Sequence, residues 1–209
     1  MIVESQTLVL FAVAATLTIL SPGPDTINVM RQGLSNGRRA GLIAVLGVQC
    51  GLLVHTVLAV FGISALIASS PIALKTVAIA GATYLAWIGF QGFRGTGVIR
   101  IETANTPNTA WRAFRDAALV NLLNPKVIVL FLALFPNFID ATRDNVGAQL
   151  TVLSAVLIAI NAAWQGGLVL AVAAVRRWLG DQRIARAINW GTGAILICFA
   201  VLLILDHAL

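Results

Sequence analysis

The stretch Ser21-Pro22-Gly23-Pro24-Asp25 interrupts an apolar segment near the start of the chain, and Asn121-Leu122-Leu123-Asn124-Pro125-Lys126 interrupts another after its middle. Proline removes a backbone donor and clashes with the carbonyl four residues earlier, so each stretch predicts a break in a helix. A broken helix persists in a membrane only where protein or a polar cavity satisfies the freed backbone groups. Each break also carries one ionisable residue, and the two have opposite charges.

The composition of the chain indicates a membrane protein. Of its 209 residues, 59% are hydrophobic and 11% are charged, whereas soluble domains carry about 25% charged residues. A membrane-spanning helix needs about 20 apolar residues. The predicted spans are residues 5–30, 41–68, 71–93, 113–139, 147–175 and 185–205. The predicted fold class is an all-α integral membrane protein of six transmembrane helices, with helices 1 and 4 broken at the proline motifs.

The basic residues predict the orientation in the membrane. Eleven of the fourteen Lys and Arg side chains fall in three alternate loops, within residues 31–39, 94–115 and 176–186. Because cytoplasmic loops retain Lys and Arg, both termini are predicted to face the outside. The net charge of +6 is therefore a topology signal, and the expected partner is the lipid bilayer and not nucleic acid.

A segment rich in Gly, Thr, Asn and Pro marks the clearest internal boundary of the chain. The prediction is a single transmembrane domain, 1–209, made of repeat one, 1–94, a cytoplasmic connection, 95–112, and repeat two, 113–209. Three helices in each half give the halves opposite orientations, which is the inverted-repeat plan of many secondary transporters. A shift of 101 residues places Pro24-Asp25 on Pro125-Lys126.

The two breaks predict a binding site for a small zwitterion. Ser21 is expected to cap a new half-helix with Pro22 in its first turn, and Asn124 and Pro125 to repeat this arrangement. The free donors of a half-helix suit a carboxylate, Lys126 adds a positive charge, and Asp25 can hold an ammonium group or exchange a proton. The predicted substrate-binding residues are Ser21, Pro22, Gly23, Pro24, Asp25, Asn28, Asn121, Asn124, Pro125 and Lys126.

A structural alternative stays open, in which Asp25 and Lys126 only neutralise each other, because a lone charge at this depth costs at least about 2.5 kcal/mol. Asn121 is one turn before Pro125 and could satisfy carbonyls freed by the break.

Other polar side chains within the apolar spans are candidates of lower rank. Gln49, Tyr84, Asn161 and Gln165 are predicted to line a pathway or, alternatively, to bridge helices. The proton-coupling candidates are Asp25 and His55; for His55, a buried ring satisfied by a neighbouring helix is the alternative.

The residues of both motifs resemble the LysE/RhtB family of amino-acid exporters. In the N-terminal half the resemblance is carried by Leu20 to Asp25, Gly33, Gly37, Gly41, Gly47 and the segment Tyr84 to Gly89. In the C-terminal half it is carried by Asn121 to Lys126, Phe131, Phe135-Pro136 and Phe138. The resemblance extends over nearly the whole chain.

This resemblance implies export of amino acids or close derivatives across the bacterial inner membrane by proton antiport. The two helix breaks predict that this transport proceeds by alternating access. Neutral cargo such as threonine, homoserine or leucine is favoured, because Asp25 is the one carboxylate predicted well inside the membrane. Basic amino acids and cysteine derivatives remain alternatives. The glycine spacings permit a homodimer.

Three other classes fit less well. A thiol-disulfide carrier needs cysteines that can approach each other, but Cys50 and Cys198 are expected to be small buried hydrophobes away from the breaks. A divalent-metal exporter would want clustered ligands, and only Asp25 and His55 are available. An intramembrane enzyme would need a nucleophile, base and orienter that do not occur together. We therefore expect no catalysis, no metal site and no cofactor.

Overall fold

A computed structural model of the chain describes residues 2–21, 23–69, 109–143 and 145–171, and the isolated positions 76, 79, 83, 86, 87, 90, 190, 191, 194, 197, 198 and 201. These residues form helices and their connections, with no strand among them, which confirms the all-α class. By length and composition, the helical stretches Pro24–Gly62, which is interrupted at Gly37, and Val146–Leu170 suffice to cross a membrane, and the bent pair Ala110–Leu122 with Pro125–Phe138 makes a third if it is one span. Most of the predicted spans 71–93 and 185–205 lies outside the described residues.

The first predicted span is broken at the first proline motif. Helix α1 (Ser5–Leu20) ends at Ser21, whose φ of −64° and ψ of 117° are extended. Helix α2 (Pro24–Ser69) begins three residues later, and the Ile27 N–H donates to the Gly23 carbonyl over 3.0 Å. The predicted cap at Ser21 is therefore wrong, because the new half-helix starts at Pro24. The physical reason is that Pro24 disfavours a helical conformation at the residue before it.

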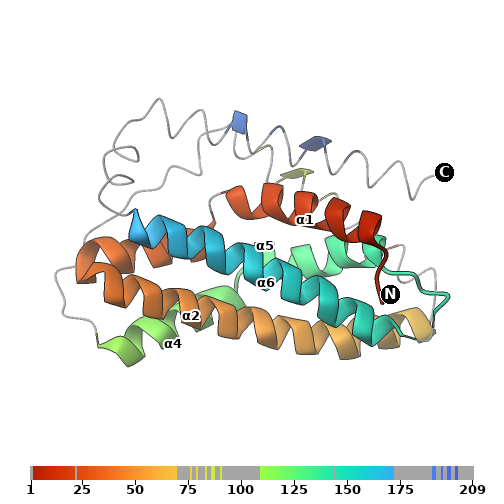
Figure 1. Ribbon diagram of the computed structural model, residues 1–209, viewed down its shortest axis with the longest axis horizontal. Helices are drawn as coiled ribbons and strands as arrows, with labels where there is room; N and C mark the ends of the chain where they lie inside the picture. The colour runs from red at the N-terminus through yellow and green to blue at the C-terminus, as the bar shows by residue number, and fades with distance from the viewer. Residues whose placement is uncertain are drawn as a thin grey trace.

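Helix α2 contains two helices that meet at Gly37. This residue has φ 83° and ψ 170°, a left-handed conformation that glycine adopts without a steric penalty. A β-carbon on Gly41 would lie 3.0 Å from the Gly33 Cα, whereas residues eight apart in a continuous helix are about 12 Å apart. The chain thus reverses at Gly37, as Figure 1 shows. The predicted ten-residue connection between spans 5–30 and 41–68 is in fact this single turn.

The second proline motif divides the predicted fourth span. Helix α4 (Ala110–Leu122) ends at Leu123, and helix α5 (Pro125–Val129) follows it. The segment Pro125–Phe138, which α5 begins, makes an angle of 50° with α4. The side chain of Asn124 accepts a hydrogen bond from the Lys126 N–H over 3.0 Å. This confirms the predicted cap and the predicted break. The segment continues as a π-helix, η1 (Leu130–Leu134), and a 3-10 helix, η2 (Phe135–Phe138).

Two glycines bring α2 and α4 into close contact. A β-carbon on Gly47 would overlap the Phe114 carbonyl oxygen, and one on Gly51 would lie 2.9 Å from the Asn121 Cβ. The GxxxG spacing of α2 is therefore filled by this chain's own α4 and not by a second copy. The later glycine of α2, Gly51, meets the later residue of α4, Asn121. This part of α2 therefore runs parallel to α4.

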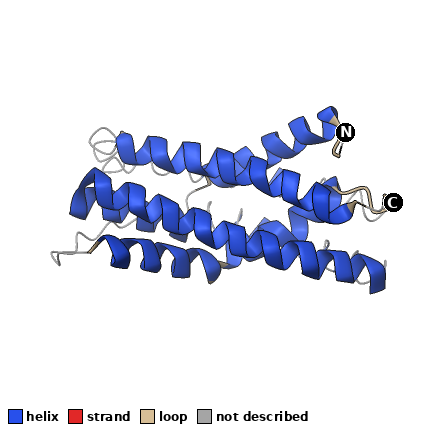
Figure 2. Cartoon of the chain, turned by 60° about the horizontal axis from the view of Figure 1, so that its bottom comes forward, coloured by secondary structure: helices blue, strands red, loops and turns tan. Residues whose placement is uncertain are grey.

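Helix α6 (Val146–Leu170) completes the described bundle and packs against α1 and α2. Figure 2 shows these helices side by side, with their axes roughly aligned. Buried apolar side chains from all of them form one core, which includes Phe11, Ala15, Val29, Val48, Phe135, Leu150 and Leu157. Apolar residues also remain exposed on the outer faces of α1 and α2, including Val9, Val13, Leu46, Leu53, Val57 and Phe61. Such faces suit a lipid environment, so the protein is a multi-pass membrane protein.

The two ends of the bundle differ in charge. Exposed Arg38 and Arg39 follow the Gly37 turn, and exposed Arg112 and Arg115 lie near the start of the parallel helix α4, so all four share one end. At the other end, Arg143 pairs with Glu4 over 3.0 Å. Basic residues from two of the three predicted cytoplasmic loops therefore gather together.

The two cysteines are exposed, so the expectation that they are buried hydrophobes is wrong. Cys50 lies on an outward side of α2, away from the helix contacts made by the neighbouring Gly51.

Candidate functional site

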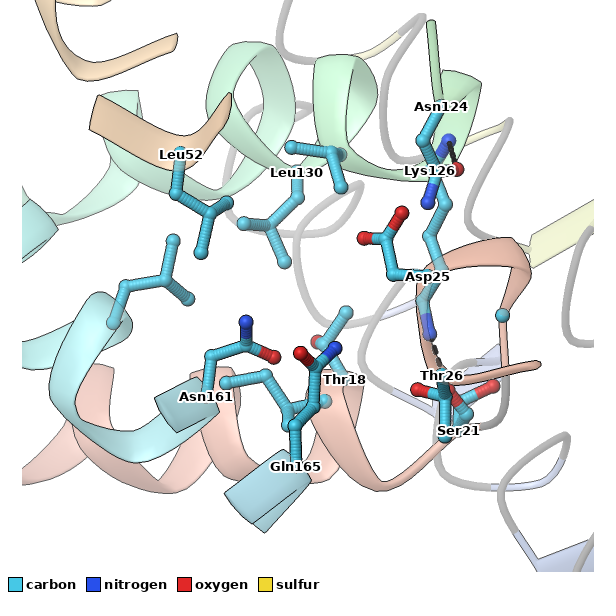
Figure 3. A pocket seen from close by; sticks show the side chains of 14 residues that line it. Thr18, Ser21, Asp25, Thr26, Leu52, Asn124, Lys126, Leu130, Asn161 and Gln165 are labelled. Atoms are coloured by element: carbon cyan, nitrogen blue, oxygen red, sulfur yellow. Dashed lines mark hydrogen bonds between the residues drawn. The ribbon is translucent and has the colours of Figure 1, made fainter. Parts of the chain in front are cut away.

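The two helix breaks meet at one small cavity of about 50 Å³. Figure 3 shows Asp25 and Lys126 at one side of it and the α6 amides of Asn161 and Gln165 at another. Its described lining residues are Thr18, Ile19, Ser21, Gly23, Asp25, Thr26, Leu52, Asn124, Lys126, Val127, Leu130, Leu157, Asn161 and Gln165. The space suffices for a few water molecules, which limits any ligand of this conformation to a small one.

Lys126 connects the second break to the first. Its Nζ donates a hydrogen bond to the Ser21 carbonyl over 2.6 Å. That carbonyl follows the last residue of α1, where helix carbonyls lose their intrahelical partners. The side chain reaches it by crossing Gly23, where a β-carbon would lie 3.4 Å from the Lys126 Cδ. An ammonium from one break thus stabilises the backbone freed by the other.

Asp25 lies in the first turn of the second half-helix and is 8% exposed. Its Oδ2 accepts a hydrogen bond from the Asn121 Nδ2 over 2.8 Å, whereas its Oδ1 makes no hydrogen bond with a described residue. No ion pair within 4.0 Å joins Asp25 to Lys126. The two charged groups therefore face the cavity with separate partners and with bonding capacity left over.

Asn121 holds the carboxylate of Asp25 from the other half of the chain. It is fully buried against Gly51. Its backbone carbonyl accepts from the Asn124 N–H over 3.0 Å and contacts the His55 Nε2 at 3.3 Å. We predicted that the Asn121 amide could satisfy carbonyl groups freed by the break. Instead this amide donates to the Asp25 carboxylate, and the freed Asn121 carbonyl is contacted by Asn124 and His55.

His55 is a buried ring packed against the fourth span. It stacks on Phe131 with 5.6 Å between ring centres, in addition to its contact with Asn121. It lines a separate cavity of about 430 Å³ together with Leu58, Ala59 and Phe131. These contacts match the buried histidine satisfied by a neighbouring helix, and Asn121 contacts both His55 and Asp25.

Several predicted site residues lie elsewhere. Asn28 is buried one turn beyond Asp25 but does not line the cavity, and both its amide atoms lack a described hydrogen-bond partner. The same holds for the amide atoms of half-buried Gln49. Pro24 and Pro125 begin their half-helices and are exposed. Pro22 and Tyr84 lie outside the described residues.

The cavity also contains residues that sequence reasoning missed. Thr18 is one turn before Ser21 in an apolar helix. Its polar side chain at this position could have indicated that it faces the cavity. Leu52, Leu130 and Leu157 gave no signal, because apolar residues in apolar helices do not reveal which of them face a cavity.

Aromatic rings pack together between the cavity and the end of the bundle that contains Glu4. Phe11 packs edge-on against Phe135 and Phe138, with ring centres 5.2 and 5.3 Å apart. Phe131 stacks on Phe135 at 4.4 Å. Phe11 is two turns before the cavity residue Thr18, so these rings lie between the cavity and the end of the bundle.

Beyond the rings, Arg143 joins two segments distant in sequence. It bonds the Glu4 carboxylate over 3.0 Å and the Asp140 carboxylate over 2.7 Å. Hydrogen bonds from the hydroxyl and N–H of Thr142, and then from Arg143, lower the pKa of Asp140 below its ordinary value. The acidic partners raise the pKa of Arg143. We name Glu4, Asp140 and Arg143 the outer clasp.

The chain has well-matched relatives. An uncharacterized membrane protein of Vibrio cholerae is 36% identical over 193 residues, which cover 92% of this chain and 94% of that protein. A homoserine/homoserine lactone efflux protein of Salmonella typhimurium is 32% identical over 92% of this chain and 93% of its own length. A threonine efflux protein of Escherichia coli is 31% identical over 94% of this chain and 96% of its own length. No solved structure matches the chain.

A family model also matches most of the chain. The model of the LysE type translocators covers residues 16–207, which include both helix breaks and every described residue that lines the cavity. The chain therefore belongs to the LysE type translocator family.

Proposed function

We propose that this protein exports a small neutral amino acid, or a close derivative, across the bacterial inner membrane by proton antiport. The observation that carries the proposal is the cavity between the breaks, where Asp25 and Lys126 stand without pairing to each other. Similar proteins are named for the efflux of homoserine, threonine and leucine, which supports the same class of cargo.

The charges around the cavity favour a neutral cargo. Asp25 is the one carboxylate among the described residues that line it. An α-ammonium group occupies this carboxylate, and a second cationic group on the cargo would then enter an apolar region without a counter-ion. A basic amino acid or a cysteine derivative is the alternative, and the transport assay below includes lysine for this reason.

The cargo binds through both charged ends. Its carboxylate binds the Lys126 ammonium, which has donors left after its bond to Ser21. Its ammonium binds Asp25 through Oδ1, the oxygen without a described hydrogen bond, and displaces a proton. Asp25 takes up a proton again after release of the cargo, and this step resets the cycle.

The architecture that we propose for this cycle is the six-helix inverted repeat. Repeat one, 1–94, and repeat two, 113–209, rock against each other around the cavity, with both termini outside and 95–112 in the cytoplasm. The gathering of Arg38, Arg39, Arg112 and Arg115 at one end supports this orientation. The phenylalanine contacts and the outer clasp support a conformation closed to the outside, with cargo entering from the basic end.

Proteoliposomes that contain the purified protein test the proposal. The assay measures counterflow of labelled threonine, homoserine, leucine and lysine, with and without an imposed pH gradient. We expect counterflow of at least one neutral amino acid, acceleration by the gradient, and no counterflow of lysine. The variant Asp25→Asn should lose counterflow, because an amide neither exchanges a proton nor pairs with an ammonium group.

The matched control is Asp116→Asn, since Asp116 pairs with Arg115 near the basic end and does not line the cavity. This control should transport as the unchanged protein does. Full neutral amino-acid counterflow in Asp25→Asn would contradict the proposed role of Asp25. Absence of counterflow for every amino acid with the unchanged protein would contradict the function itself.

A further inference from the structure

Two amides on α6 face the cavity with unused hydrogen-bonding groups. Asn161 and Gln165 are four residues apart and share one helix face, and they are 8% and 1% exposed. Figure 3 shows both amides on one side of the cavity, with Leu52 and Leu130 on another. The Gln165 Oε1 is buried without a hydrogen-bond partner among the described residues. A buried amide in this state costs free energy unless a ligand or water satisfies it.

Two other neutral polar side chains of the cavity already have hydrogen-bond partners. Thr18 donates its hydroxyl to the Ala14 carbonyl of its own helix over 2.9 Å, and Asn124 caps α5. Leu52, Leu130 and Leu157 form apolar walls, and the hydroxyl residues Ser21 and Thr26 line the cavity beside Lys126 (Figure 3). On the side of the cavity formed by α6, the described amides available to a ligand are thus those of Asn161 and Gln165 (Figure 3).

The position of the amides relative to the charges indicates which part of a cargo they meet. This step rests on the proposed function, in which Asp25 and Lys126 bind the ammonium and carboxylate groups of the cargo. Both groups are bonded to the α-carbon of the cargo, so they occupy the same side of the cavity. The side chain of the cargo then projects toward the rest of the cavity, where α6 presents Asn161 and Gln165.

We propose that Asn161 and Gln165 recognise a hydroxyl group on the side chain of the cargo, which makes small hydroxylated amino acids the preferred class. An amide offers a donor and an acceptor, and a hydroxyl group offers both in return. An aliphatic side chain of the same shape would leave the two amides unpaired. A charged side chain would find no counter-ion among the described lining residues other than the groups already used.

Threonine and valine provide a matched pair of probes, because they differ only by a hydroxyl group in place of a methyl group. Counterflow of both is measured in the same proteoliposomes, so the amount of active protein cancels from their ratio. We expect the unchanged protein to favour threonine by about fivefold, which is the typical effect of one hydrogen bond. Gln165→Met and Asn161→Leu should each bring the ratio toward one.

The control variant is Thr151→Val, on an exposed face of the same helix, where the Thr151 hydroxyl bonds only the Gly147 carbonyl. Its threonine-to-valine ratio should equal that of the unchanged protein. Size-exclusion chromatography verifies that each variant is folded, and where one variant fails this step the ratio of the other variant tests the role of the amides.

The outcomes separate the two proposals. Equal counterflow of threonine and valine by the unchanged protein would overturn the hydroxyl recognition but leave amino-acid export standing. A threonine preference that both variants retain would also overturn the role of these amides. Absence of counterflow for every amino acid would overturn the proposed function and this inference together.

Discussion

At the scale of single residues, Asp25 and Lys126 have opposite charges but both bond to neutral partners. Each is the charged residue of one helix break, yet each is held by a neutral group from the other half of the chain: Asn121 for the carboxylate and the Ser21 carbonyl for the ammonium. Opposite charges in direct contact neutralise each other and offer little to a ligand. Neutral partners keep both charges in place and available to a zwitterion.

The role of the ammonium group is testable with Lys126→Met, which keeps an unbranched apolar side chain to cross Gly23 but removes the charge. We expect the KM for the transported amino acid to rise at least about tenfold, because a hydrogen bond to a charged group contributes about 1.5–3 kcal/mol. Concentration-dependent counterflow measures this change. The control is Arg39→Gln, an exposed position near the Gly37 turn. An unchanged KM in Lys126→Met would argue against carboxylate binding at this residue.

At the scale of elements, the contact between α2 and α4 determines where the carboxylate of Asp25 points. Gly51 lets α4 approach closely enough for Asn121 to be fully buried against α2. Asn121 then reaches Asp25 on the preceding half-helix. A glycine that touches neither charge therefore positions one of them.

We expect Gly51→Ala to lower both the thermal midpoint and the transport rate. The new methyl group would overlap Asn121, and overpacking of this kind costs about 1–3 kcal/mol. The matched control is Gly62→Ala in the same helix, where a β-carbon meets no described atom within 4 Å. This control should be neutral or slightly stabilising, because alanine favours the helix over glycine by up to about 1 kcal/mol. Thermal unfolding in detergent and counterflow measure both variants, and equal midpoints for the two would contradict the tight contact.

At the scale of the whole molecule, two layers of contacts lie at one end of the bundle. The phenylalanine rings lie nearer the cavity, and the outer clasp joins the segment before α1 to the segment before α6. The proposed alternating access requires both layers to separate when the cavity opens to the outside. Breaking the clasp should therefore favour the outward-open state.

A thiol reagent that does not cross membranes tests this expectation. The reporter is Thr18→Cys in a chain without Cys50 and Cys198, and labelling is applied from the side of the termini. We expect Arg143→Gln to increase the labelling rate several-fold, whereas Arg115→Gln at the opposite end should leave it unchanged. Equal labelling with and without Arg143 would show that the clasp does not control access.

The pH dependence of the same labelling follows from the lowered pKa of Asp140. A carboxylate whose pKa is lowered in the folded state contributes stability above its ordinary pKa, near about 4, and loses that contribution as pH falls through the lowered value. Asp140 should therefore stay ionised between about pH 7 and 5. In the chain with Arg143 intact, its titration should not alter the labelling rate of the reporter within this range. A rise that follows the titration of Asp140 within this range would contradict the lowered pKa.

Local rules determined much of this protein before any packing is considered. Hydropathy indicates the membrane class, and proline places both helix breaks, because the missing donor and the ring clash act within one turn of the chain. The cap at Asn124 follows from the same short range. The half-helix after the first break starts at Pro24 and not at Pro22. The local rule predicts the break but does not tell which of the two prolines begins the helix.

Only the tertiary structure decided which groups meet across the breaks. The bond of Lys126 to the Ser21 carbonyl and that of Asp25 to Asn121 join residues about a hundred positions apart. Such contacts depend on how closely α4 approaches α2, which glycine permits but does not specify. For the same reason the leucines of the cavity could not be recognised in the sequence: in an apolar helix, lipid, core and cavity all accept the same side chain.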